Sequence, residues 1–194
     1  MSETPVHLPP RLPPRLLPGC ELRLLREEQL PDYKALRDRM LAGHDEAFTS
    51  DAATELARSA ESYRSRISQG PGGACLFTLT AWLDGTLIGA VSCEREPRQK
   101  VRHTAHLIGM MVDDPVQGRG IGRALLHAAL RLLEQEDGIE LVTLSVTSSN
   151  RGAVALYESM GFRRYGCLPR ALKLADGRTL DKDLMCLDLQ HPAR

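Results

Sequence analysis

The chain has 194 residues, of which 42% are hydrophobic and 26% charged, a composition typical of soluble globular proteins rather than disordered ones. Lys and Arg (25) balance Asp and Glu (25), so the chain lacks the basic excess that nucleic-acid-binding and membrane-surface proteins need. We therefore expect neither a nucleic acid nor a membrane among its partners. No apolar run approaches the roughly 18 residues that span a bilayer.

Neither a secretion signal nor a disulfide framework is predicted. Prolines interrupt the first 18 residues before an apolar stretch can form. The five cysteines are odd in number, widely spaced and without a C-x-x-C pair, which is poor material for disulfides or a zinc site. We expect a cytoplasmic protein without a bound metal, in which each cysteine is a small buried hydrophobic residue.

Residues 1–19 are predicted to be an extended, Pro- and Arg-rich leader. The prolines from Pro9 to Pro18 favour polyproline II and exclude a helix or a central strand. A docking peptide for an aromatic groove is one interpretation of this leader, and a simple tail is the preferred one. Residues 20–194 are expected to form a single domain.

The first half of the domain alternates between strand and helix patterns. Residues 21–26 partly alternate and predict a strand, and Leu30 to Leu41 follow with helical spacing. A second helix is expected, with Leu56, Ala60, Tyr63 and Ile67 on one face and its end at Gly70–Gly73. Two strands then flank Asp84-Gly85, a strong hairpin signal; they are predicted at 74–83 and 86–93.

The second half continues with a strand at 104–112 and a long amphipathic helix that begins near Gly120. A buried strand at 139–146 and a short helix from Asn150 to Met160, closed by Gly161, come next. The last strands are predicted at 162–167, 171–174 and 183–189, with a turn at Asp176-Gly177. This order predicts a single mixed α/β domain.

The segment from Leu107 to Gly122 carries the clearest functional signal, because an apolar strand runs into a Gly-rich loop that opens a helix. Glycines let the backbone approach a ligand, and the first amides of a helix have no internal acceptors. Together with the helix dipole, they predict a phosphate or pyrophosphate site. The P-loop motif does not fit, since no Lys follows the loop, and G-x-G-x-G after a meander is not the dinucleotide fingerprint.

What fits is Q-x-x-G-x-G, residues 117–122, and here the sequence resembles the GNAT superfamily of acyl-CoA-dependent N-acetyltransferases. The stretch N-R-G-A-V-A-L-Y-E-S-M-G-F from Asn150 to Phe162 resembles the family's second signature. The matched segments cover about residues 104–166. The resemblance implies a central mixed, mostly antiparallel sheet with splayed middle strands, flanked by helices, and acetyl-CoA as acyl donor.

The resemblance also implies which residues meet the cofactor. In the family the loop holds the CoA pyrophosphate, and the acyl-pantetheine lies between two splayed strands, here expected at 110–112 and 141–146. The expected cofactor-binding residues are Met110, Met111, Val112, Gln117, Gly118, Arg119, Gly120, Ile121, Gly122, Arg123, Asn150 and Ala153. From the residues alone, the glycines could form a ligand-free turn, Asn150 an N-cap and Tyr157 ordinary core packing.

The implied reaction is direct transfer of an acetyl group to the primary amine of a small molecule or peptide. The family places a Tyr near the CoA sulfur, which here is Tyr157, and an oxyanion-binding backbone amide on the splayed strand, here Met111 or Val112. An amine of pKa roughly 10.4 must lose a proton before attack. For this base His106 ranks before His103 and Glu94. Even spacing predicts that His106, Met110 and Val112 share one sheet face and that Met111 lies on the other.

Two other functions are consistent with the same residues. A non-catalytic acyl-CoA-binding sensor or partner-binding module is the main alternative, which the intact Tyr157 disfavours. A nucleotide-binding α/β protein is the third. The acceptor amine, the oligomeric state (family members are often homodimers) and the role of the leader are left open by the sequence.

Overall fold

The computed structural model describes residues 16–68 and 74–190. Seven strands form one sheet in the order β1-β2-β3-β4-β5-β7-β6, and all neighbours are antiparallel except β4 and β5, which are parallel. The strands are β1 (Cys20–Leu24), β2 (Cys75–Leu83), β3 (Thr86–Arg95), β4 (Thr104–Val112), β5 (Leu141–Thr147), β6 (Arg163–Lys173) and β7 (Thr179–Asp188). The predicted mixed α/β fold with a mostly antiparallel sheet is confirmed.

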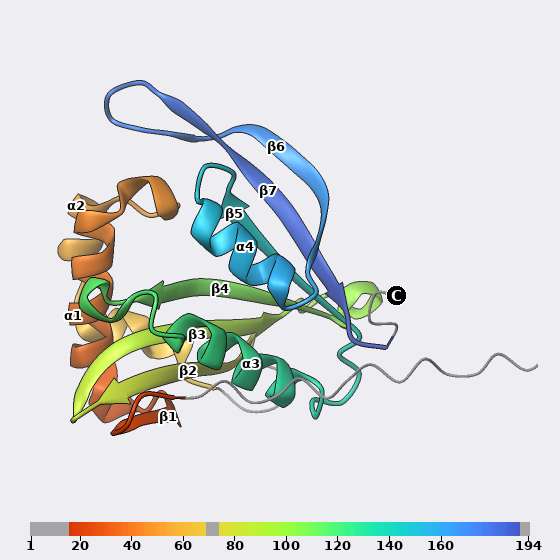
Figure 1. The fold of residues 1–194 in the computed structure, drawn as a ribbon. Coiled ribbons are helices and arrows are strands. Elements are labelled where there is room, and N and C mark those ends of the chain that lie inside the picture. Colours follow the sequence, from red (N-terminus) through yellow and green to blue (C-terminus); the bar gives the residue numbers. More distant parts are fainter. Residues whose placement is uncertain (1–15, 69–73, 191–194) are drawn as a thin grey trace, which may run out of the picture.

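Within the described ranges, four α-helices flank this sheet (Figure 1): α1 (Leu30–Gly43), α2 (Ala52–Leu56), α3 (Ile121–Leu133) and α4 (Arg151–Ser159). Short 3₁₀ turns are η1 (Glu27–Gln29), η2 (Asp45–Ala47), η3 (Ala60–Arg66), η4 (Gln99–Val101) and η5 (Asp114–Val116). No helix in the described ranges is both long and apolar enough to cross a bilayer.

The two faces of the sheet carry separate apolar cores. Residues of α3 and α4, among them Leu125 and Tyr157, pack with Val91 and Val142 of the sheet. On the opposite face, α1 and η3 pack Tyr33 and Tyr63 against the other side of β2, β3 and β4. Complete burial of a leucine contributes about 1.5–3 kcal/mol, so the apolar stripe of α3 holds that helix against the sheet.

The hairpin predicted at Asp84-Gly85 is confirmed. Both residues have positive φ, 49° and 81°, as a two-residue turn whose twist matches that of the flanking strands requires. Strand β4 coincides with the predicted range, and α3 begins directly after Gly120 as expected.

The single helix predicted through Leu56 and Tyr63 is wrong, because the chain forms α2 and then η3. Ser59 has an extended backbone, with ψ 160°, and so interrupts the helix. Leu56 is consequently 67% exposed, whereas Tyr63 is buried in the core under α1. The serine hydroxyls favour this break, since the Ser62 hydroxyl donates to the Ser59 carbonyl at 2.7 Å. The expected helix end at Gly70–Gly73 lies outside the described residues.

The C-terminal strands also differ from the prediction. The pieces expected at 162–167 and 171–174 form one strand, β6, whose register shifts around Arg170, a residue with φ 54°. Asp181 stabilises this irregularity by accepting the Arg170 amide at 2.8 Å. Cys20, Cys75 and Cys93 are buried as expected, but Cys167 is exposed because it lies on this edge strand. Of the leader, residues 1–15 lie outside the described residues.

Candidate functional site

The sheet splits between its two parallel strands. β4 and β5 pair only from Thr104 to His106, opposite Leu141 to Thr143, and they diverge beyond these residues. The Gln117 side chain bonds the Val112 carbonyl at 3.0 Å, at the end of β4 that lies past the paired segment. The splay predicted for these strands is therefore present.

A bulge in β4 changes which side chains face each side of the sheet. Ala90 pairs with Met111 but Ser92 pairs with Ile108, so β4 holds one extra residue between them, and Gly109 there has φ 59°. Directly opposite residues share a face, so Met111 lies on the face of Ile108 and His106.

The predicted grouping of His106 with Met110 and Val112 is therefore wrong. Met110 and Val112 lie on the α3 side, where both approach Gly122, while Met111 packs in the core beneath α1. The extra residue reverses the alternation that even spacing assumed.

The backbone of β4 presents the Val112 amide to the split. The Asp113 amide donates to the Ile88 carbonyl on β3 at 2.8 Å. Since N–H groups of successive residues point to opposite edges of a strand, the Val112 N–H points away from β3 and the Met111 N–H points toward it. Of the two amides expected at the oxyanion, Val112 carries the one that faces the split.

The glycine loop lies at the mouth of the split, between η5 and α3. Gly118 and Gly120 have φ of 73° and 85°, a backbone conformation that side-chain-bearing residues rarely adopt. The first amides of α3 have no acceptors within the helix, and no acidic residue lies in its first turn. Arg123 lies in this turn and donates to the Ser159 hydroxyl at 2.9 Å. The geometry is that of an anion site.

The far wall of the split is α4, in which Tyr157 and Asn150 occupy different places. Asn150 caps the helix, because its Oδ1 accepts the Ala153 amide at 3.1 Å. Tyr157 is 8% exposed and meets Phe162 edge to face, with ring centroids 5.9 Å apart. Burial raises the pKa of Tyr157 to about 12, so the phenol stays protonated at neutral pH.

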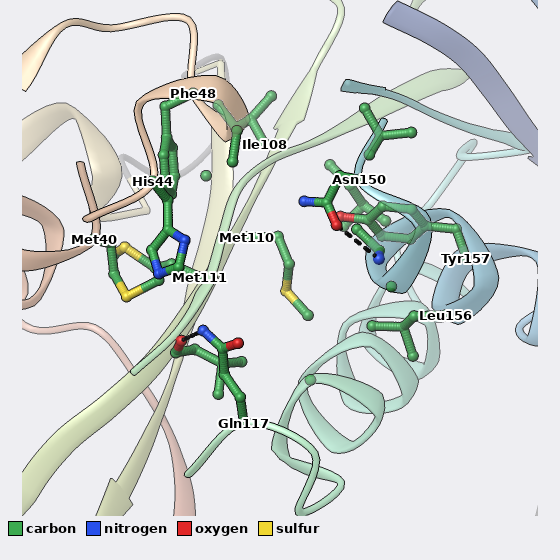
Figure 2. A pocket seen from close by; sticks show the side chains of 18 of the residues that line it. Met40, His44, Phe48, Ile108, Met110, Met111, Gln117, Asn150, Leu156 and Tyr157 are labelled. Carbon is green, nitrogen blue, oxygen red and sulfur yellow. Dashed lines mark hydrogen bonds between the residues drawn. The ribbon is translucent and has the colours of Figure 1, made fainter. Parts of the chain in front are cut away.

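A cavity of about 770 Å³ joins these features (Figure 2). All the expected cofactor-binding residues except Arg119 line it, and so does Tyr157. Figure 2 shows Met110 between the His44 side and the Tyr157 side of the cavity.

None of the three expected bases lines this cavity. The ring nitrogens of His106 lie 2.6 Å from Thr143 Oγ1 and 3.3 Å from Glu96 Oε2, and Glu94 forms an ion pair with Arg66. His103 uses its backbone carbonyl to accept the amides of Glu140 and Leu141.

The sequence pointed to the N-terminal helices, about residues 27–69, and to the C-terminal hairpin as acceptor-recognition segments, but it named no residue of the cavity wall opposite α4. This wall comes from α1, the segment after it, η3 and β7; it includes Arg37, Met40, His44, Phe48, Thr49, Ser50, Arg66 and Lys182. Ser145 also lines the cavity, from the strand β5 that was expected there. His44 there places Nε2 2.6 Å from Asp114 Oδ1. No motif marks these residues, because segments more than 130 positions apart in the chain meet only on folding. In the described ranges, no three His, Cys, Asp or Glu residues are grouped closely enough to hold a metal ion.

A mixed sheet split between two parallel strands, with a glycine loop and a helix N-terminus at the mouth, defines the GNAT class of folds. The model of the acetyltransferase (GNAT) family matches residues 35–162, and the chain belongs to this family. The resemblance that the two sequence signatures indicated is thereby confirmed.

Curated relatives carry names of acetyltransferases. The chain is 40% identical over 102 residues to N-alpha-acetyltransferase RimI of Mycobacterium tuberculosis, covering 51% of this chain and 61% of that protein. It is 32% identical over 148 residues to mycothiol acetyltransferase of Salinispora tropica, covering 76% and 46%. It is 37% identical over 91 residues to the ribosomal protein bS18-alanine N-acetyltransferase of Escherichia coli, covering 47% and 60%. The chain thus spans about half to three fifths of these relatives' lengths.

Solved structures share the fold. An acetyltransferase of the GNAT family from Streptococcus pneumoniae superposes with a TM-score of 0.78 at 22% identity, covering 88% of this chain and 99% of the other. A ribosomal-protein-alanine N-acetyltransferase from Brucella melitensis gives a TM-score of 0.74 at 25% identity, covering 87% and 99%.

Proposed function

We propose that this protein is an N-acetyltransferase that moves an acetyl group from acetyl-CoA directly to a primary amine of a small molecule or peptide. The observation that carries this proposal is the split between β4 and β5, with an anion site at its mouth and Tyr157 on its wall. The names of the relatives support acetyl transfer to an amine.

The residues present fit acetyl-CoA. The pyrophosphate would meet the free amides of the loop and α3. No atom lies within 4 Å of the point where a Cβ on Gly118 would be, so the backbone there is open to a ligand. Leu156 Cδ2 and Met110 Cε lie 3.3 and 3.4 Å from where a Cβ on Gly122 would be, so a larger residue there would crowd the apolar wall. The unpaired edge of β4 offers backbone groups to the amide-containing pantetheine arm.

The chain contributes a polarising amide and a proton-bearing phenol. When bound, acetyl-CoA supplies the acetyl group as an activated thioester. The Val112 N–H, which faces the split, donates a hydrogen bond to the carbonyl oxygen under attack. Because His106 lies outside the cavity lining, the amine proton would pass to water in the cavity rather than to His106.

Tyr157 acts as a hydrogen-bond donor to the sulfur that leaves. A phenol of pKa about 12 facing a thiol of pKa about 8.5 makes complete proton transfer uphill by about 5 kcal/mol. The phenol therefore stabilises the developing thiolate and keeps its proton.

The proposal is tested by calorimetric binding of acetyl-CoA to the wild type, Arg123→Glu and Arg131→Glu, followed by thiol release with a panel of amines. Both variants make the same charge change on α3, but only Arg123 lies at the proposed phosphate site. We expect Arg123→Glu to weaken binding at least about 10-fold and Arg131→Glu to leave it unchanged. No binding by the wild type would contradict the assignment, and binding without turnover on any amine would support the non-catalytic module.

We further propose a reducing, cytoplasmic setting. Buried thiols at Cys20, Cys75 and Cys93, whose pKa values burial raises, support it because such thiols are unreactive packing groups.

A further inference from the structure

The side of the cavity away from the glycine loop is lined by cations. Four lining residues have cationic side chains, namely Arg37, Arg66, Arg123 and Lys182, and no Asp or Glu of the described residues lines the cavity with them. Arg123 lies at the loop, so the other three belong to the side where an acceptor would bind. Arg66 is paired with Glu94, at 2.8 Å, which leaves Lys182 and Arg37, whose own carboxylate partner Glu55 is shared with Arg58.

Lys182 brings its charge to the cavity from β7. Lys182 lies directly opposite Thr147 of β5, so the two side chains share one face of the sheet. The Thr147 hydroxyl donates to the Glu46 carbonyl, so this face is the one covered by the segment after α1. There the Lys182 ammonium donates to the Thr49 hydroxyl at 2.6 Å. Partial burial lowers the pKa of Lys182, and no carboxylate among the described residues offsets that effect.

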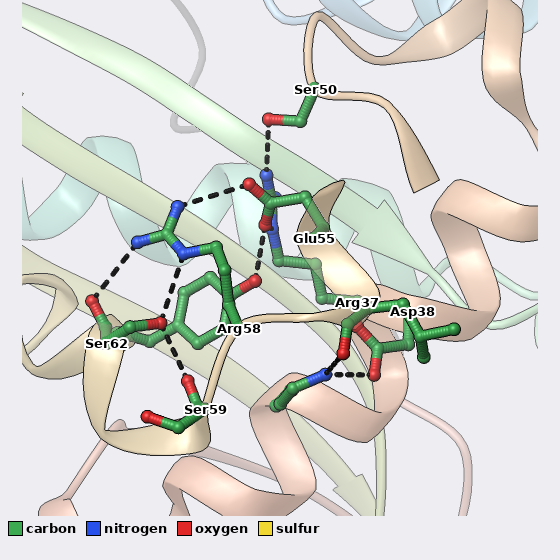
Figure 3. Close-up of polar contacts among 10 residues, drawn as sticks. Arg37, Asp38, Ser50, Glu55, Arg58, Ser59 and Ser62 are labelled. Atoms are coloured by element: carbon green, nitrogen blue, oxygen red, sulfur yellow. Dashed lines mark hydrogen bonds and ion pairs between the residues drawn. The ribbon is translucent and has the colours of Figure 1, made fainter. Parts of the chain in front are cut away.

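Arg37 brings a second cation from α1. It is 7% exposed; its Nε donates to Glu55 at 2.8 Å and its Nη2 donates to the Ser50 hydroxyl at 3.1 Å (Figure 3). Glu55 also pairs with Arg58, at 3.2 Å. One carboxylate therefore serves two guanidinium groups.

The two cations line the same cavity, and their hydroxyl partners, Thr49 and Ser50, are consecutive residues. Each hydroxyl accepts a hydrogen bond without supplying negative charge, so the Lys182 ammonium, unlike the Arg37 guanidinium with its Glu55 partner, has no carboxylate to offset its charge. Removing a cation from water without an anionic partner costs free energy, which a bound anion would recover. The site is therefore built for a ligand that carries an anionic group.

We infer that the acceptor amine carries a carboxylate, and that Lys182, with Arg37 beside it, binds this carboxylate next to Thr49 and Ser50. The inference rests on the proposed function, and it excludes polyamines and other purely cationic amines as preferred acceptors. The carboxylate can belong to a small amino acid or to an acidic residue of a peptide, and the experiment separates these sources.

The test compares matched acceptors that differ only in this charge. One arm uses ω-amino acids of increasing length and their amides; the other uses peptides with Glu or Gln after the N-terminal residue. In one of the two arms, we expect the wild type to use the acid with a kcat/KM at least about 10-fold higher than that for the matching amide. A charge-assisted hydrogen bond provides a difference of this size. Lys182→Met should abolish the preference, Lys182→Arg should retain most of it, and Thr49→Val should weaken it.

Two controls separate recognition from general damage. Lys173→Met removes the same charge from the neighbouring strand β6, at an exposed position outside the cavity lining, and should leave the acid-to-amide ratio unchanged. Acetyl-CoA affinity, measured by calorimetry, should be the same in all variants, because Lys182 lies away from the phosphate site. Arg37 is not substituted, because its removal would leave the buried Glu55 carboxylate without this ion-pair partner.

The outcomes are distinguishable. Equal rates on acids and amides in the wild type, or an equal loss on both in Lys182→Met, would overturn the inference and leave the proposed function standing. A weaker affinity of Lys182→Met for acetyl-CoA would assign Lys182 to the cofactor instead and overturn it as well. Turnover on no amine at all would overturn the proposed function, and the inference with it.

Discussion

The Gln117 side-chain amide joins Val112 and Asp114: its Nε2 donates to the Val112 carbonyl at 3.0 Å and to Asp114 Oδ1 at 2.7 Å. Val112 is the last residue of β4, where β5 has already diverged, and Gln117 opens the glycine loop. One side chain thus couples the unpaired strand edge to the anion site. This hydrogen bond explains in part why β4 and β5 can stay apart there. Without it, the Val112 carbonyl would need a donor from β5 or from water.

Gln117→Met should weaken acetyl-CoA binding, because the Val112 carbonyl loses its donor while the volume of the side chain is kept. We expect a several-fold rise in Kd and a loss of about 1 kcal/mol in the free energy of unfolding. Calorimetry and chemical denaturation measure the two effects. An unchanged Kd would show that this bond does not hold the loop in its binding geometry.

Tyr157→Phe should lower kcat by about 10- to 100-fold and leave the affinity for acetyl-CoA unchanged. The ring keeps its edge-to-face contact with Phe162, and only the hydrogen bond to the leaving sulfur is lost. Steady-state kinetics and calorimetry on the same variant separate these effects. A kcat equal to that of the wild type would remove Tyr157 from the reaction.

The raised pKa of Tyr157 has a consequence for stability at high pH. Its value of about 12 in the folded state exceeds the roughly 10 of an unfolded chain, so folding favours the neutral phenol. This contribution is fully present below pH 10 and is lost as the pH rises through 12. Denaturation between pH 9 and 11.5 should therefore show a smaller decline for Tyr157→Phe than for the wild type, and parallel declines would contradict the assignment.

Glu55 is expected to make the fold sensitive to acid. Burial alone would raise its pKa, but hydrogen bonds from Tyr63 and Arg37 and the charges of Arg37 and Arg58 hold it at about 2. The stabilisation is therefore complete above pH 4.5 and lost as the pH falls toward 2. Glu55→Gln should cost about 3 kcal/mol at pH 7, since it leaves Arg37 buried without its partner. Urea denaturation at pH 7 and pH 3 measures this, and the difference between the variant and the wild type should shrink at pH 3.

Gly109→Ala separates backbone strain from function. A Cβ at this position would have no close contact, its nearest neighbour being the Tyr33 hydroxyl at 3.8 Å, so the cost comes from φ 59° alone and should be about 1–2 kcal/mol. Gly138→Ala, with φ 73° and open space, is the matched control at a position that does not line the cavity. Both variants should lose similar stability, but only Gly109→Ala should lose activity, because it disturbs the bulge in β4. Equal activities would show that the bulge is not needed for the reaction.

Local chemistry was sufficient to predict several parts of this protein. The Asp84-Gly85 turn, the glycine loop before α3 and the Asn150 cap each depend on residues within a few positions of one another. Positive φ, helix capping and free helix amides are properties of such short segments, so the anion site and its family resemblance were recognisable in the printed sequence. The same holds for β4 and α3, whose patterns are long and regular.

Long-range pairing decided the rest. One extra residue at Gly109 reversed the faces of Met110, Met111 and Val112, and only the register against β3 reveals it. The cationic side of the cavity combines Arg37 from α1 with Lys182 from β7, which no spacing rule connects. Such convergence follows from strand order and register, which depend on contacts between distant segments rather than on neighbouring residues. The proposed cofactor site could therefore be predicted from the sequence, whereas the residues of the proposed acceptor site are brought together only by the tertiary structure.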